Sequence, residues 1–314
     1  MENLIAAIFS TDFVFSILRL STPILLAGLA ALITDRAGVM NIGLEGIMLS
    51  AALMGVIGSA FTQSAFMGFL CAIATGVLIA LVMAYFALNL KTDIILTGIA
   101  LNLLASGGTV FVLYSVAKDK GMSTSLASLT MPTINIPILQ SIPVLGKILS
   151  GHNLLTYLAF IAVLIVWVLL YKTPLGLKIR VVGENSHAAE SVGINVKRIQ
   201  YSALAISGVL AAMGGAYMSM GYMDKFARDM TAGRGFIALA AEALGRGTPV
   251  GTLIASLVFG TADALGSNLQ VLDIPVQFIQ MMPYLFTIIG LVLYAVMKAK
   301  QISKIKIKGN EASK

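Results

Sequence analysis

Apolar segments long enough to cross a lipid bilayer recur along the entire chain of 314 residues. A helix needs about 20 apolar residues to cross the hydrocarbon core. In lipid, backbone polar groups have to be satisfied within each segment, and none of these segments shows the alternation of a barrel strand. We therefore expect helices near residues 13–33, 38–60, 65–88, 94–117, 154–171, 201–223, 235–268 and 276–297.

The predicted fold class is an all-α polytopic membrane protein, with about 8–10 transmembrane helices when broken and re-entrant segments are included. Hydrophobic residues make up 58% of the chain and charged residues only 11%, whereas charged residues are roughly a quarter of a soluble protein. The sequence leaves no room for a separate soluble domain, so we expect residues 1–314 to form one transmembrane domain surrounded by membrane lipid.

The net charge of +7 has a membrane explanation, because Lys and Arg accumulate on cytoplasmic loops. It therefore does not indicate a nucleic-acid partner. Basic residues gather in the loop 172–200 and in the tail 298–314, which predicts that both, and the C-terminus, are cytoplasmic. The single cysteine, Cys71, excludes an intramolecular disulfide, and the two histidines are too few to predict a metal site.

This orientation requires the segment 235–268 to enter and leave the membrane from the outer side. We therefore expect a half-helix near 235–245, a turn at 246–249 and a returning helix. The longest outer connection, between Ala117 and Leu154, is either an ordered loop or a re-entrant, surface-lying segment. Its prolines favour the ordered loop, because proline is costly inside a helix.

Several ionisable and amide side chains fall inside the apolar segments. Asn41 and Glu45 are four residues apart, which predicts that they share one face of the second helix. Glu242 and Asp263 repeat the situation in the later split segment. A charge at the bilayer centre costs on the order of 3 kcal/mol, so we expect these groups to face a polar cavity or a partner.

Arg36 and Arg246 are the expected ionic partners of Glu242 and Asp263. For Glu45 and Glu242 two roles remain open. One is lining or gating a transport path, and the other is a structural ion pair or a helix-terminus cap.

A short internal repeat also points to a path. In the first half of the chain Arg36 precedes Glu45, and in the second half Arg234 precedes Glu242. The two arginines are expected on opposite sides of the membrane, which is the arrangement that an inverted repeat would give. Asn102 could hydrogen-bond a polar solute, but an interhelical hydrogen bond is the favoured interpretation. The predicted substrate path consists of Asn41, Glu45, Asn102, Glu242 and Asp263.

The loop 172–200 holds a stretch of small residues between basic flanks. Asn185 or Ser186 can cap a short helix that runs through Ala188 and stops at Gly193. Small side chains would let this helix sit deep in a groove of another protein. We therefore favour a docking element over a solvated connector.

Four segments carry a resemblance to a known family. They are Asp-Arg-Ala-Gly-Val-Met-Asn-Ile-Gly-Leu-Glu-Gly at 35–46, Thr-Pro-Leu-Gly-Leu-Lys-Ile-Arg at 173–180, Gly-Glu-Asn through Gly-Ile at 183–194, and Gly-Arg-Gly-Phe-Ile-Ala-Leu-Ala at 233–240. The chain resembles, over nearly its full length, the permease subunits of bacterial ABC importers. It is most similar to the nucleoside and simple-sugar branch, and more distantly to ribose and branched-chain amino-acid permeases.

The resemblance implies an ABC importer permease in the bacterial cell membrane that forms the path for nucleosides or simple sugars. It further implies three partners: a cytoplasmic ATPase, a second and usually different permease subunit, and an outer substrate-binding protein, often a lipoprotein. The residues implied in coupling to the ATPase are Gly183, Glu184, Asn185, Ala188, Ala189 and Gly193.

ATP and Mg are expected on that partner, because this chain lacks a Gly-rich loop ending in Gly-Lys-Ser/Thr. No cofactor is expected on the chain itself, and it is not expected to be an enzyme. An intramembrane enzyme is poorly supported, since neither His-Glu-x-x-His nor Gly-x-Ser-x-Gly occurs.

Other transport roles stay open. The solute could be a ribose-like sugar or a branched-chain amino acid. An ion-coupled secondary transporter would use Glu45, Glu242 or Asp263 as a proton relay. A passive structural subunit would lack a continuous polar lining.

Overall fold

A computed structural model describes residues 10–137 and 144–269, and most of these residues are helical. Within these ranges seven helices are long and apolar enough to cross a membrane, which confirms the polytopic all-α fold. They are α2 (Thr11–Asp35), α3 (Leu44–Thr62), α4 (Ala65–Ala84) with its π-helical extension (Tyr85–Asn89), α5 (Ile94–Ala117), α8 (Leu154–Lys172), α11 (Val196–Tyr217) with its π-helical extension (Met218–Tyr222), and α13 (Pro249–Leu269). The span expected near 276–297 and the tail 298–314 lie outside the described residues.

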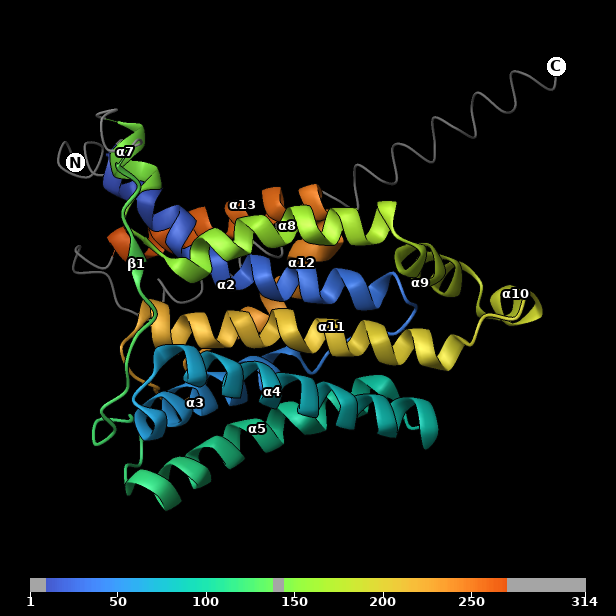
Figure 1. The fold of residues 1–314 in the computed structure, drawn as a ribbon, viewed down its shortest axis with the longest axis horizontal. Helices are drawn as coiled ribbons and strands as arrows, with labels where there is room; N and C mark the ends of the chain where they lie inside the picture. The colour runs from blue at the N-terminus through green and yellow to red at the C-terminus, as the bar shows by residue number, and fades with distance from the viewer. Residues whose placement is uncertain (1–9, 138–143, 270–314) are drawn as a thin grey trace.

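The spanning helices lie side by side along the long axis of the molecule, with α10 (Ser186–Ser191) at one end and α7 (Leu145–Leu149) at the other (Figure 1). α2 is central and packs against α8, α11, α13 and the short helix α12 (Arg234–Leu244). In an apolar 18-residue stretch of α2, 83% of the residues are buried inside the protein. In the corresponding stretch of α5, at the margin of the bundle, only 17% are buried. In the membrane, α5 must therefore be covered by lipid or by another subunit.

Small residues let the helices approach closely. A Cβ added at Gly76 of α4 would lie 2.7 Å from the carbonyl oxygen of Gly208 in α11, and one at Gly208 would lie 2.7 Å from the carbonyl oxygen of Gly76. Because membrane helices gain little hydrophobic drive from association, such backbone contact supplies much of the packing. Gly76 and Gly208 therefore allow close backbone packing where α4 crosses α11.

The second predicted span is wrong at its start. α3 begins at Leu44, and the chain from residue 36 to residue 43 is not helical. Gly38 has a φ of +69°, a conformation that favours glycine, and the Asn41 side chain accepts a hydrogen bond from the Gly43 N–H at 3.1 Å. Asn41 therefore lies in a turn before α3, and it does not share a helix face with Glu45.

The split segment has the predicted form. α12 runs over Arg234–Leu244, a turn follows, and α13 begins at Pro249. Arg246 and Gly247 both have positive φ, at 56° and 62°, as the tight reversal requires. The two helices pack against each other as a hairpin.

The predicted loop 172–200 is mostly helical, with α9 (Pro174–Glu184) followed by α10 and by α11, which begins five residues earlier than the expected 201. At the opposite end, the long connection before α8 is an ordered loop in its described part. It contains the strands β1 (Thr133–Ile134) and β2 (His152–Asn153), paired antiparallel, and α7. The Met131 N–H donates to the Met220 carbonyl at 2.8 Å, which ties the loop to α11's extension.

Candidate functional site

Two parts of the molecule carry the polar groups that the sequence singled out. The first, which we call the junction, consists of Asn41, Glu45, Asn102, Gly233 and Gly235, where the starts of α3 and α12 meet inside the bundle. The second is the pair of short helices α9 and α10 at one end of the bundle (Figure 1).

Glu45 joins α3 to α12. One carboxylate oxygen accepts the Gly233 N–H at 2.8 Å, and the other accepts the Gly235 N–H at 2.7 Å. Gly233, the residue before α12, has no side chain with which to cap the helix. Glu45 supplies the acceptor in its place and sets a negative charge at the positive end of the α12 dipole. Of the two roles left open for Glu45, its geometry is that of a helix-terminus cap.

Gly235 is needed for this contact. A Cβ added there would lie 2.8 Å from the Glu45 carboxylate and 2.7 Å from the Glu45 Cα atom. Any larger residue at position 235 would push α12 away from α3. The glycine motif at 233–240 thus has a steric reason, which is the approach of α12 to Glu45.

The two asparagines hold the non-helical segment in place. Asn41 is fully buried, and its amide donates to Ser207 Oγ in the middle of α11 at 3.0 Å. Asn102 of α5 donates to the Ile42 carbonyl at 2.9 Å and accepts the Gly46 N–H at 2.8 Å. The predicted hydrogen bond from Asn102 to another helix is therefore present. Because both ends of its amide contact protein, a solute would have to compete with these bonds.

The ionic partner predicted for Asp263 is wrong. Asp263 pairs with Arg234 at 3.4 Å, across the α12–α13 hairpin, and both side chains are largely buried. Arg36 instead donates from Nε to the Gly247 carbonyl at 2.9 Å. Sequence could not separate these choices, because it does not show which arginine faces α13 once α12 turns back.

Glu242 is buried, with 8% of its surface exposed. No ion pair to it occurs among residues 10–137 and 144–269, so the pairing predicted with Arg36 or Arg246 is not formed. Its role in the substrate path stays a prediction.

The turn at Arg36 to Gly38 connects the junction to α9. A Cβ added at Gly38 would lie 3.3 Å from the Gly183 Cα atom of α9. From the other side, the turn contacts the α12–α13 reversal through Arg36 and Gly247. The chain then continues directly to Asn41 and Glu45. A displacement of α9 would therefore act on the segment that positions the junction.

The short helix predicted in the loop 172–200 is confirmed as α10, and Asn185 is its cap, accepting the Ala188 N–H at 3.0 Å. Gly193, with φ +82°, follows its end. The side chain of Ala188 is exposed, but that of Ala189 is fully buried in the main core. Val192, which was not among the predicted coupling residues, is 74% exposed at the end of α10.

Two cation–π contacts involve the last residues of α8 at this end of the bundle. Lys172 lies over the ring of Trp167 at 5.6 Å, and the Arg180 guanidinium lies over Tyr171 at 5.2 Å. Aromatic and basic side chains together are typical of the membrane interface. We therefore expect α9 to lie at the edge of the membrane, and Figure 1 shows α10 farther from the bundle than α9.

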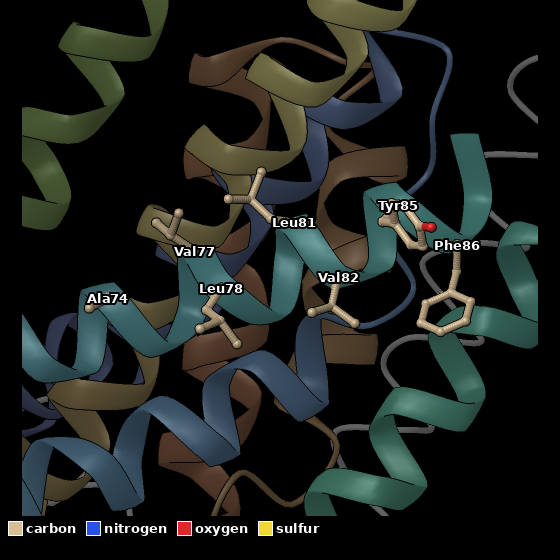
Figure 2. Close-up of a pocket in the computed structure, with 7 residues that line it drawn as sticks. All are labelled: Ala74, Val77, Leu78, Leu81, Val82, Tyr85 and Phe86. Atoms are coloured by element: carbon tan, nitrogen blue, oxygen red, sulfur yellow. The ribbon is translucent and has the colours of Figure 1, made fainter. Parts of the chain in front are cut away.

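The cavity drawn in Figure 2 is an unsuitable site for a polar solute. It has a volume of about 710 Å³ and lies along α4 and its extension. The lining side chains are apolar except for the Tyr85 hydroxyl, and they are Ala74, Val77, Leu78, Leu81, Val82, Tyr85 and Phe86. A second cavity of about 270 Å³, between α3, α4 and α5, includes Ser50, Thr75 and Thr109 among its lining residues.

Sequence comparison identifies similar proteins over most of the chain. The model of the family described as branched-chain amino acid transport system / permease component matches residues 13–297. The nucleoside ABC transporter permease protein NupC of Lactococcus lactis is 35% identical, over 90% of this chain and 91% of the relative. The guanosine ABC transporter permease protein NupQ of Bacillus subtilis is 36% identical, over 86% and 88%. A second guanosine permease protein of that bacterium, NupP, is 27% identical, over 83% and 74%.

The fold has a counterpart among solved structures. An inward-facing ABC transporter structure, described as of the metal-chelate type, superposes with a TM-score of 0.51 at 17% identity, over 92% of this chain and 85% of that chain. At this identity the likeness concerns the fold alone.

Proposed function

Because the chain belongs to the permease family of the branched-chain amino acid transport systems and is a multi-pass permease of the ABC transporter type, we propose that it forms the translocation path for nucleosides or related simple sugars. The nucleoside and guanosine permeases that resemble it over most of their length support this choice of solute. The alternatives, ribose-like sugars and branched-chain amino acids, would use the same architecture.

The cap that Glu45 provides for α12 is the observation that best supports the proposed location of the path. Two helices that start inside the bundle, α3 and α12, meet there at their N-termini. Transporters commonly place their solute sites at such broken helices near the membrane centre, where backbone polar groups can face the solute. The residues Asn41, Glu45, Asn102, Glu242 and Asp263 are the path residues of this proposal.

Energy is supplied by a cytoplasmic ATPase, with its ATP and Mg, that receives α10. In this assignment the contact surface consists of Ala188 and Val192, and Ala189 anchors the helix in the core. The exposed residues Gly183 and Glu184 at the end of α9 complete it. Motion of the ATPase would reach the junction through Gly183, Gly38 and the segment that leads to Glu45.

Two further partners belong to the proposal. A second permease covers part of the exposed helices. The presence of two guanosine permease proteins in one bacterium, both similar to this chain, supports a different but homologous partner. An outer binding protein, a lipoprotein in many such importers, delivers the solute at the end of the bundle that carries α7. With that end outside, α10 and the C-terminus are cytoplasmic.

An ion-coupled mechanism finds less support. The Glu45 carboxylate accepts two backbone hydrogen bonds, and Asp263 is paired with Arg234. Both groups therefore have a structural partner already, which does not favour a mobile proton. Glu242 is the remaining candidate for such a relay.

Purification from the bacterial membrane in mild detergent tests the assembly. We expect an ATPase, a homologous permease and an outer binding protein to co-purify, and the binding protein to bind radiolabelled guanosine. Isolation of the chain without an ATPase under conditions that preserve transport would contradict the proposal. Binding of leucine or ribose in place of guanosine would correct the solute but leave the architecture standing.

A further inference from the structure

Asp229 places a half-exposed carboxylate beside the middle of a membrane-spanning helix. Ser106, halfway along α5, donates from Oγ to Asp229 Oδ1 at 2.7 Å. The other oxygen of Asp229 lies 3.4 Å from Arg228 Nε, and the two side chains are 51% and 64% exposed. A carboxylate offers about four lone-pair positions. Asp229 therefore keeps acceptor capacity for another molecule.

Lipid cannot cover this carboxylate, because ionised groups at membrane depth face a bundle interior or a water-filled cavity. The side of α5 next to Ser106 consequently faces water or a polar surface. The surroundings of Ser106 thus differ from the cavity along α4 in Figure 2, which is lined by apolar side chains apart from the Tyr85 hydroxyl. The pair of Asp229 and Arg228 was not singled out in the sequence, where it falls in a connection between two spans.

The segment that carries Asp229 leads to the junction. At its start, the Arg228 N–H donates to the Gly121 carbonyl, beyond the end of α5, at 2.7 Å. At its end, the Gly233 N–H donates to Glu45. Asp229 lies between these two fixed points.

The place of Ser106 on α5 also puts Asp229 close to the junction. Asn102, which binds the start of α3, precedes Ser106 by four residues and lies on the same face of the helix. Ser106, and with it Asp229, is therefore one helical turn from the junction, toward the end that carries α7. A solute that moves from that end to the junction would pass Asp229.

Resting on the proposed function of the chain as a solute path, we infer that Asp229 is a solute-binding residue. Its two carboxylate oxygens accept hydrogen bonds from vicinal hydroxyls of a neutral nucleoside or sugar. Ser106 is the positioning residue that holds the carboxylate toward the path.

Cysteine labelling of the complete transporter in proteoliposomes tests this inference. Cys71 is the only cysteine of the chain, so Cys71→Ser gives a background in which one introduced thiol can be followed. A membrane-impermeant cationic thiosulfonate added from the side of the binding protein is expected to label Asp229→Cys. Saturating guanosine, with the binding protein present, is expected to slow labelling, because a solute bound in the path covers position 229.

Two matched positions control the labelling. Asp224→Cys, also exposed and in the same connection, should react without protection by guanosine. Leu164→Cys, 62% exposed on the apolar surface of α8, should not react. A second arm measures guanosine uptake, which Asp229→Asn should lower by about tenfold while Asp224→Asn leaves it unchanged at equal amounts of chain in the membrane.

The outcomes separate the two proposals. If the wild-type transporter takes up guanosine but Asp229→Cys is unreactive or unprotected, or Asp229→Asn transports normally, this inference is overturned and the proposed function stands. A complete wild-type transporter that takes up neither guanosine nor ribose nor glucose overturns the proposed solute class, and this inference with it.

Discussion

The Glu45 carboxylate of α3 accepts a hydrogen bond from the Gly235 N–H of α12 at 2.7 Å, across 190 positions of the sequence. This contact, together with the one to Gly233 at 2.8 Å, makes the start of one helix depend on a side chain of another. A rearrangement that separates α3 from α12 must leave backbone donors without a partner or give them a new one. The contact is therefore the point at which a transport cycle would act on the bundle.

Replacing Glu45 should destabilise the start of α12. Glu45→Ala removes both acceptors, and we expect a loss of roughly 1–3 kcal/mol in the free energy of unfolding, as for a lost helix cap with buried donors. Glu45→Gln keeps one acceptor oxygen and should lose less. Thermal unfolding in detergent, with amide hydrogen exchange at residues 233–237, measures both. Equal stability of Glu45→Ala and wild type would show that the cap does not contribute to the free energy of unfolding.

Ala188 and Ala189 are neighbours with opposite expected effects. Ala188 is exposed, so Ala188→Arg should leave the amount of folded chain unchanged but lower ATP-driven uptake by about tenfold or more through loss of ATPase contact. Ala189 is fully buried, so Ala189→Leu should overpack the core and cost about 1–3 kcal/mol of stability. Chain abundance, ATPase co-purification and uptake distinguish the two. Normal uptake by Ala188→Arg at full abundance would remove α10 from the coupling surface.

Gly183 tests the connection between α9 and the junction. A Cβ there would collide with the Arg36 carbonyl, so Gly183→Ala must move α9 away from the Arg36 turn. We expect ATP hydrolysis to continue while uptake per ATP falls, because the motion no longer reaches Glu45. Gly121→Ala is the matched control, since a Cβ at Gly121 meets no atom within 4 Å. If both variants had the wild-type ratio of uptake to ATP hydrolysis, the proposed route through Gly183 would have to be abandoned.

His152 makes the loop near α7 sensitive to acid. Burial lowers its pKa below the usual 6.5, a nearby Arg19 charge adds to this, and its hydrogen bond to the Ile148 carbonyl opposes it. The ring stacks on Phe15 with 3.9 Å between centroids. As the pH falls through 6.5, the unfolded chain takes up a proton before the folded chain does. Stability is therefore lost below that pH, until the folded pKa is passed.

The corresponding measurement is the melting temperature in detergent at about pH 7.5 and about pH 5.5. Between these two pH values, the melting temperature of wild type should fall by more than that of His152→Asn, whose side chain cannot be protonated. The same loss in both proteins would assign the acid sensitivity to other groups.

Much of the fold could be predicted because it depends on hydrophobic length. The bounds of α5 agree with the expected span, and the turn at 246–249 was marked by its glycine and proline. The start of α3 was misjudged because apolar composition continues through 38–43, where the backbone instead turns. In a membrane protein, hydrophobicity reports burial in lipid or protein and does not reveal where a helix is interrupted.

The side-chain partners could not be predicted in the same way. The choice of Arg234 for Asp263, and of backbone N–H groups for Glu45, depends on how α12 folds back against α3 and α13. Asp229 was overlooked because its connection looked like an ordinary outer loop, yet its carboxylate reaches Ser106 in the middle of α5. Such contacts between distant positions have no local signal in one sequence.

Whether transport by this permease depends on a separate ATPase is measured most directly by uptake of radiolabelled guanosine into proteoliposomes. The proteoliposomes contain the permease pair and the outer binding protein, with and without the ATPase. We expect accumulation only when the ATPase and ATP are both present, and none with a proton gradient alone. Accumulation against a gradient in liposomes that lack the ATPase would contradict this expectation.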